Sequence, residues 1–81
     1  MEIYMTLPQD LSDLTKEQGE NIVKYLCENN DINGLRKRQE LTEKQIKVVF
    51  NKEDERSIRA LNNLRIMEKH LQEAILIKSQ H

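Results

Sequence analysis

The fold of this chain is decided by residues 52–78, which read KEDERSIRALNNLRIMEKHLQEAILIK. Apolar residues recur in this stretch at alternating spacings of four and three, which places their side chains on one face of an α-helix. They are Ala60, Leu64, Met67, Leu71 and Ala74. At 1.5 Å per residue such a helix is roughly 40 Å long. We therefore predict a long C-terminal helix over residues 52–78, with an apolar face against which the rest of the chain packs.

The start of this helix is predicted from its polar residues. Asn51 is a favoured N-cap residue, and the acidic run Glu53–Glu55 follows it. The positive end of the helix dipole favours acidic side chains in this first turn. An alternative stays open at this stage, in which one unbroken helix runs over residues 43–78.

A capping box predicts a separate helix over residues 42–51. Thr42 and Gln45 have the spacing at which a hydroxyl and a side-chain amide satisfy free backbone amides at a helix start. Leu41 and Ile46 occupy the two positions of a hydrophobic staple around this cap. The pattern therefore indicates a helix start at Thr42.

Two further helices are predicted before it. Thr15 and Gln18 form another capping box, at the start of a helix within residues 12–29 that begins near Thr15 or one turn earlier. Its apolar face consists of Ile22, Val23, Leu26 and Cys27. Asp31 is placed to cap a short helix over residues 32–40.

The composition supports an all-α fold in one domain. The chain has 81 residues, of which 37% are hydrophobic, and it contains only one Pro and two Gly, too few for the many turns of an all-β fold. We expect one domain over residues 1–81, in which three short helices pack on a longer C-terminal helix. Residues 1–10 are expected to form an extended lead.

Charge is distributed unevenly along the chain, although the formal net charge is only −1. Residues 1–31 carry two basic and seven acidic side chains, whereas residues 32–81 carry eleven basic and seven acidic ones. We expect the two parts to attract each other, or to offer different partners opposite charges.

No arrangement typical of catalysis, metal binding or cofactor binding is found in the sequence. Cys27 is the only cysteine and lies on an apolar helix face, where a thiol behaves as a small hydrophobic group. His70 and Glu73 are spaced to share a metal ion, but two ligands are too few. We expect a protein that is not an enzyme and has no cofactor.

The sequence also predicts a cellular location. It has no apolar run of the roughly 20 residues that a membrane-spanning helix needs. Its first residues lack the basic start and apolar middle of a signal peptide, and a lone cysteine fits a reducing compartment. We expect a cytoplasmic protein.

The C-terminal helix carries apolar residues on two sides, which suggests contacts with other chains. Ile66 and Ile77 lie opposite the Leu64/Leu71 side, with His70 between them. We expect Ile66, His70 and Ile77 to bind another protein, since exposed apolar patches often mark such sites. We also expect a homodimer that buries Leu64, Leu71 and Ile75.

Residues 41–50, which read LTEKQIKVVF, resemble the start of the DNA-reading helix of homeodomains. The chain departs from that family where the helix reads bases, because Val49 replaces its Trp and Lys52 replaces its adenine-binding Asn. No family is assigned on this basis. A broader helix-turn-helix interpretation remains, in which Leu35, Leu41 and Ile46 are buried. Its DNA contacts would come from Arg36, Lys37, Arg38, Lys44 and Lys47.

Two classes of function follow from these patterns. We expect a non-catalytic protein-binding module that acts as an adaptor, regulator or inhibitor of a larger macromolecule. The alternative is a small helix-turn-helix DNA-binding transcriptional regulator.

Overall fold

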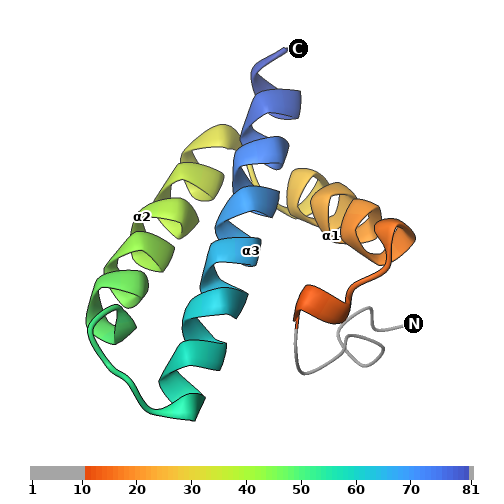
Figure 1. Cartoon of the computed structure of the whole chain (residues 1–81). Coiled ribbons are helices and arrows are strands. Elements are labelled where there is room, and N and C mark those ends of the chain that lie inside the picture. Colours follow the sequence, from red (N-terminus) through yellow and green to blue (C-terminus); the bar gives the residue numbers. More distant parts are fainter. Residues whose placement is uncertain (1–10, 81) are drawn as a thin grey trace.

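The computed structural model describes residues 11–80 and shows an all-α fold over them (Figure 1). A short 3₁₀ helix, η2 (Leu11–Asp13), precedes α1 (Lys16–Asn29), α2 (Ile32–Val49) and α3 (Glu55–Ser79). The predicted extended lead at residues 1–10 lies outside the described residues. None of the helices within residues 11–80 combines the length and the apolar character needed to span a membrane.

The long helix α3 lies between the other two and contacts both (Figure 1). Its 25 residues span about 37 Å at 1.5 Å per residue, close to the longest dimension of the molecule, 41 Å. The helix α2 runs antiparallel to it, and α1 packs against it from the other side (Figure 1). Within residues 11–80, η2, α1 and α2 each contact the predicted long C-terminal helix.

The prediction of two helices over residues 32–40 and 42–51 is wrong, because both belong to the single helix α2. Thr42 does not cap a helix start: its Oγ1 donates a hydrogen bond to the carbonyl oxygen of Arg38, 2.8 Å away. Its side chain is buried in the middle of α2. The proposed staple is also wrong, since Leu41 is 54% exposed. No Gly or Pro interrupts the helix after Gly34, so nothing ends it at residue 40.

The N-cap of the long helix is Asp54, not Asn51. The Asp54 side chain accepts a hydrogen bond from the backbone amide of Ser57 at 3.0 Å. Residues 50–54 form the turn that reverses the chain between α2 and α3. Antiparallel helices need a connection of a few residues, which the predicted boundaries left no room for. The alternative of one unbroken helix over residues 43–78 is wrong for the same reason.

The other two predicted caps are confirmed. The Thr15 hydroxyl accepts from the Gln18 amide at 3.1 Å, and the Gln18 side chain accepts from the Thr15 amide at 2.9 Å. Asp31 accepts from the Gly34 amide at 2.7 Å. The earlier start of the first helix is wrong, because η2 is a separate 3₁₀ turn that ends at Asp13.

The core is small and lies at one end of the α2–α3 pair. Its buried apolar residues are Ile22, Val23, Leu26, Leu35, Leu71 and Ala74. Three of them come from α1, and Leu35 and Ala74 are fully inaccessible. By contrast, none of residues 43–70 is buried, although they form the half of the pair nearest the connecting turn. The two halves of the α2–α3 pair therefore differ in how completely their apolar side chains are covered.

Polar contacts between α1 and α3 fix the position of α1 beside the core. Lys78 donates from Nζ to the carbonyl oxygen of Cys27 at 3.1 Å. This bond satisfies an acceptor in the last turn of α1, where helix carbonyls lack partners within the helix. The Cys27 thiol, half-buried, lies 3.7 Å from the carbonyl oxygen of Ala74. Its position beside the core agrees with its predicted behaviour as a small hydrophobic group.

Candidate functional site: an apolar groove between α2 and α3

Two adjoining hollows, which share Gln45, form a groove along the contact between α2 and α3. We call it the α2–α3 groove. Its lining comes mainly from these two helices, with one residue of α1: Leu26, Arg38, Leu41, Thr42, Gln45, Val48, Val49, Ala60, Asn63, Leu64, Met67 and Leu71. The groove begins beside the core and continues into the half of the α2–α3 pair that contains no buried residue.

One wall of the groove exposes two large apolar side chains of α2. Leu41 is 54% exposed and Val48 is 65% exposed. They are seven residues apart, so they lie on the same face of the helix, about 10.5 Å from each other along its axis. Apolar side chains that gather around a hollow on the surface are typical of a contact site for another macromolecule.

The buried polar side chains of the described residues beside the core all have hydrogen-bond partners. Thr42 already donates to the Arg38 carbonyl, and no buried side-chain nitrogen or oxygen within the described residues lacks a hydrogen-bond partner. Arg38 lines the groove on its core side, and its Nε donates to Asn30 Oδ1 at 3.1 Å. Asn30 belongs to the turn between α1 and α2, so this bond joins the groove wall to the end of α1.

The opposite end of the groove is flanked by polar anchoring contacts. Asn63 lines the groove and accepts a hydrogen bond from the Leu11 amide at 3.0 Å, which fastens η2 to α3. Phe50, the first residue of the connecting turn, has its ring centre 6.0 Å from the guanidinium of Arg65 in α3. This distance is within the range of a cation–π contact, and Phe50 remains 56% exposed.

The predicted protein-binding residues lie on another part of the surface. Ile66 and His70 line a hollow between η2, α1 and α3, and Ile77 lines the next hollow beside Val23 and Cys27. Apolar residues occur on two sides of α3 because α2 packs on one side and α1 on the other. Ile66 and His70 are half-buried and Ile77 is 42% exposed, and their binding role stays a prediction.

His70 is held in place against α1. Its Nδ1–H donates to the Ile66 carbonyl oxygen at 2.7 Å. Its Nε2 faces Gly19 so closely that a Cβ atom added to this glycine would lie 3.1 Å away. Glu73 lines the same hollow, but within residues 11–80 no group of three His, Cys, Asp or Glu side chains is placed to hold a metal ion.

Of the three residues predicted to form a dimer contact, Leu71 and Ile75 lie within or beside the core of a single chain. Leu71 is 2% exposed, so it is covered without a second copy. Ile75 packs against the core, and Leu64 lines the groove, and both are half-buried. Self-association through α3 stays a prediction.

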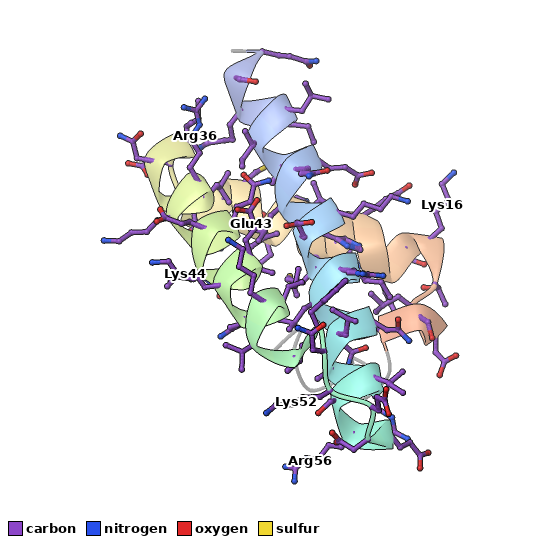
Figure 2. All side chains as sticks on the ribbon, turned by 60° about the vertical axis from the view of Figure 1, so that its left-hand side comes forward. Lys16, Arg36, Glu43, Lys44, Lys52 and Arg56 are labelled. Carbon is purple, nitrogen blue, oxygen red and sulfur yellow. The ribbon has the colours of Figure 1, made fainter. Side chains whose placement is uncertain are left out.

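The five predicted DNA-contacting residues are all exposed on α2. Arg36 and Lys44 extend from this helix away from α3 (Figure 2). The helix-turn-helix geometry predicted around them is wrong, because α2 is continuous where the turn was expected and Leu41 is exposed. DNA binding by these side chains itself stays a prediction.

The α2–α3 groove was missed from the sequence. The sequence pattern places Leu41 in a hydrophobic staple, and Val48 belongs to the apolar run Val48–Phe50, in which no single position stands out. The seven-residue spacing of Leu41 and Val48 was the available signal, but it is informative only if α2 is continuous. Comparisons with models of known protein families, with curated proteins and with solved structures found no match.

Proposed function

We propose that this chain is a non-catalytic, cytoplasmic protein-binding module, which acts as an adaptor, regulator or inhibitor of a larger macromolecule. Its contact surface is the α2–α3 groove. The observation that carries the proposal is the exposure of Leu41 and Val48 beside a groove that begins at the core and continues into the half of the α2–α3 pair without buried residues. A partner that fills the groove would remove this apolar surface from water, which favours association.

The chemistry of the groove lining supports binding more than catalysis. The lining is mostly aliphatic, and its polar members include Thr42, Gln45 and Asn63. Among the lining residues within 11–80, Arg38 is the one that carries a charge. General acid–base catalysis most often uses His, Asp, Glu, Lys, Tyr or Cys, and none of these is among the described lining residues.

The proposal is tested by single substitutions that place a charge in each apolar surface. Val48→Asp should abolish association with the partner in the source cell, because it places an unpaired carboxylate in a desolvated contact. Ile58→Asp is the matched control, because Ile58 is an exposed apolar residue of α3 that does not line the groove. The measurement is the native mass of the tagged protein in cell extract, with folding checked by circular dichroism.

The outcomes separate the two protein-binding surfaces. Loss of the complex in Val48→Asp and retention in Ile58→Asp support the groove. Loss in Ile77→Asp with retention in Val48→Asp contradicts the groove and favours the surface predicted around Ile66, His70 and Ile77. An unchanged complex in both Val48→Asp and Ile77→Asp contradicts both surfaces.

DNA binding is the second candidate, and the exposure of all five basic residues on one helix favours it. Non-specific binding of this kind weakens steeply with salt, because each neutralised phosphate releases counterions. A gel shift with random duplex at low salt tests it. Replacing Arg36 and Lys47 by Ala should then reduce the shift, whereas no shift at micromolar protein contradicts DNA binding.

A further inference from the structure

The charge among the described lining residues of the α2–α3 groove is positive. Among the lining residues that the structure describes there is no carboxylate, and Arg38 is positively charged. The helix α2 as a whole carries five basic and two acidic side chains. A partner segment in the groove would therefore meet a positive electrostatic environment along its α2 wall.

Two lysines share the exposed stripe of α2 that carries the apolar rim residues. Lys37, Leu41, Lys44 and Val48 follow one another at spacings of four, three and four, so they lie on one face. Lys44 Nζ lies 3.7 Å from Glu40 Oε1, but both side chains are 68% exposed. An exposed pair of this kind contributes little and does not prevent Lys44 from meeting another carboxylate.

The geometry of the walls selects the backbone conformation of the occupant. Both long walls are α-helices, whose backbone hydrogen bonds are made within each helix, so the groove offers no free edge to an extended strand. The part of an occupant that is desolvated against these walls must satisfy its own backbone groups, which an α-helix does. Leu41 and Val48 are two helical turns apart, which matches apolar anchors at positions i and i+7 of a bound helix.

Resting on the proposed function, we infer that the α2–α3 groove takes an acidic amphipathic helix of a partner protein. The apolar face of this helix packs against Leu41 and Val48 of α2 and against the apolar lining residues of α3, which are Ala60, Leu64, Met67 and Leu71. Its acidic side chains pair with Arg38 in the lining, and with Lys37 and Lys44, which lie outside the lining on the same stripe of α2 as Leu41 and Val48. Charge complementarity of this kind raises the association rate and selects against basic helices.

The test uses a designed probe. A fluorescein-labelled helical peptide of about 18 residues carries Leu at positions i, i+3, i+4 and i+7 and Glu on the other face, and a matched peptide carries Lys at each Glu position. Fluorescence anisotropy should show that the acidic peptide binds at least about tenfold more tightly, with an affinity that falls as salt is added. Replacing Lys37 and Lys44 together by Glu should abolish this preference.

The control variants place the binding in the groove. Val48→Asp should weaken binding of the acidic peptide at least about tenfold, and Ile58→Asp should not. Equal or tighter binding of the lysine peptide overturns the inference but leaves the proposed function standing. No binding of either peptide at about 100 µM also overturns it, whereas the complexes formed in the source cell test the proposed function separately. A dimer in light scattering that Val48→Asp abolishes would mean that a second copy fills the groove, and overturns the inference too.

Discussion

His70 and Gly19 face each other across the α1–α3 interface, where a Cβ atom added at position 19 would lie 3.1 Å from His70 Nε2. The imidazole ring has little freedom to move away, because its Nδ1–H donates to the Ile66 carbonyl at 2.7 Å. The missing side chain of Gly19 therefore lets α1 approach α3 closely at this point.

This contact predicts that substitutions at the two positions are coupled. Alanine is favoured over glycine inside a helix by roughly 0.5 to 1 kcal/mol. In a His70→Ala background, Gly19→Ala should raise the free energy of unfolding by about this amount. In the intact chain the gain should be reduced or lost, because the new methyl group displaces the imidazole ring. Urea unfolding of the four proteins in the cycle measures the coupling, and an equal gain in both backgrounds would show that the contact is absent.

The two threonines with identical capping-box spacing are predicted to respond differently to substitution. Thr15→Ala removes a cap whose two hydrogen bonds are both formed, and should lower the free energy of unfolding by about 1 kcal/mol. Thr42→Val keeps the shape of a buried side chain in mid-helix and removes only a hydroxyl that bonds within the same helix. Because valine and threonine have similar helix propensity, we expect little loss of stability.

Urea unfolding measures both threonine variants under the same conditions. A loss of about 1 kcal/mol in Thr42→Val, the usual effect of removing a cap, would indicate that a helix starts at Thr42 and would contradict the continuous α2.

The N-cap of α3 is predicted to make stability depend on acidic pH. Hydrogen bonds from the side chain and backbone of Ser57 lower the pKa of Asp54 below its ordinary value of 3.8. Because the folded-state pKa is the lower one, Asp54 stabilises the fold above the unfolded pKa and loses this effect as the pH falls through the folded pKa.

Asp54→Asn is the control for this effect, since asparagine caps a helix without titrating. Thermal unfolding between neutral pH and about pH 2 should show the advantage of the intact chain over Asp54→Asn shrinking below about pH 4. A stability difference that stays constant over this range would mean that the Asp54 carboxylate is not engaged in the cap.

Much of the fold was predicted from local sequence patterns. The apolar spacing predicts the long C-terminal helix, and the caps at Thr15 and Asp31 predict the starts of α1 and α2. These patterns depend on residues within a few positions of one another, so they can be identified in the sequence alone. The cap prediction at Thr42 failed because the same spacing of Thr and Gln also occurs inside helices. Whether Thr42 caps a helix start or lies inside a helix depends on its burial against α3. No local sequence pattern indicates this burial.

The candidate site depends even more on tertiary structure. Leu41 and Val48 form one exposed stripe only because α2 continues through residue 42, and the groove beside them exists only because α1 packs near the other end of the hairpin. The residues chosen from the sequence, Ile66, His70 and Ile77, do share a side of α3. That side already receives α1, which the sequence pattern could not indicate.

The most direct test of the groove as a protein-binding surface is site-specific photo-crosslinking in the source cell. A photoreactive amino acid is placed at Val48 in one protein and at Arg56, an exposed position of α3 outside the groove lining, in another. We expect that position 48 gives a discrete crosslinked product with another protein. Position 56 should give none of this product, or much less of it. Equal crosslinking from both positions, or a product from position 56 alone, would contradict this expectation.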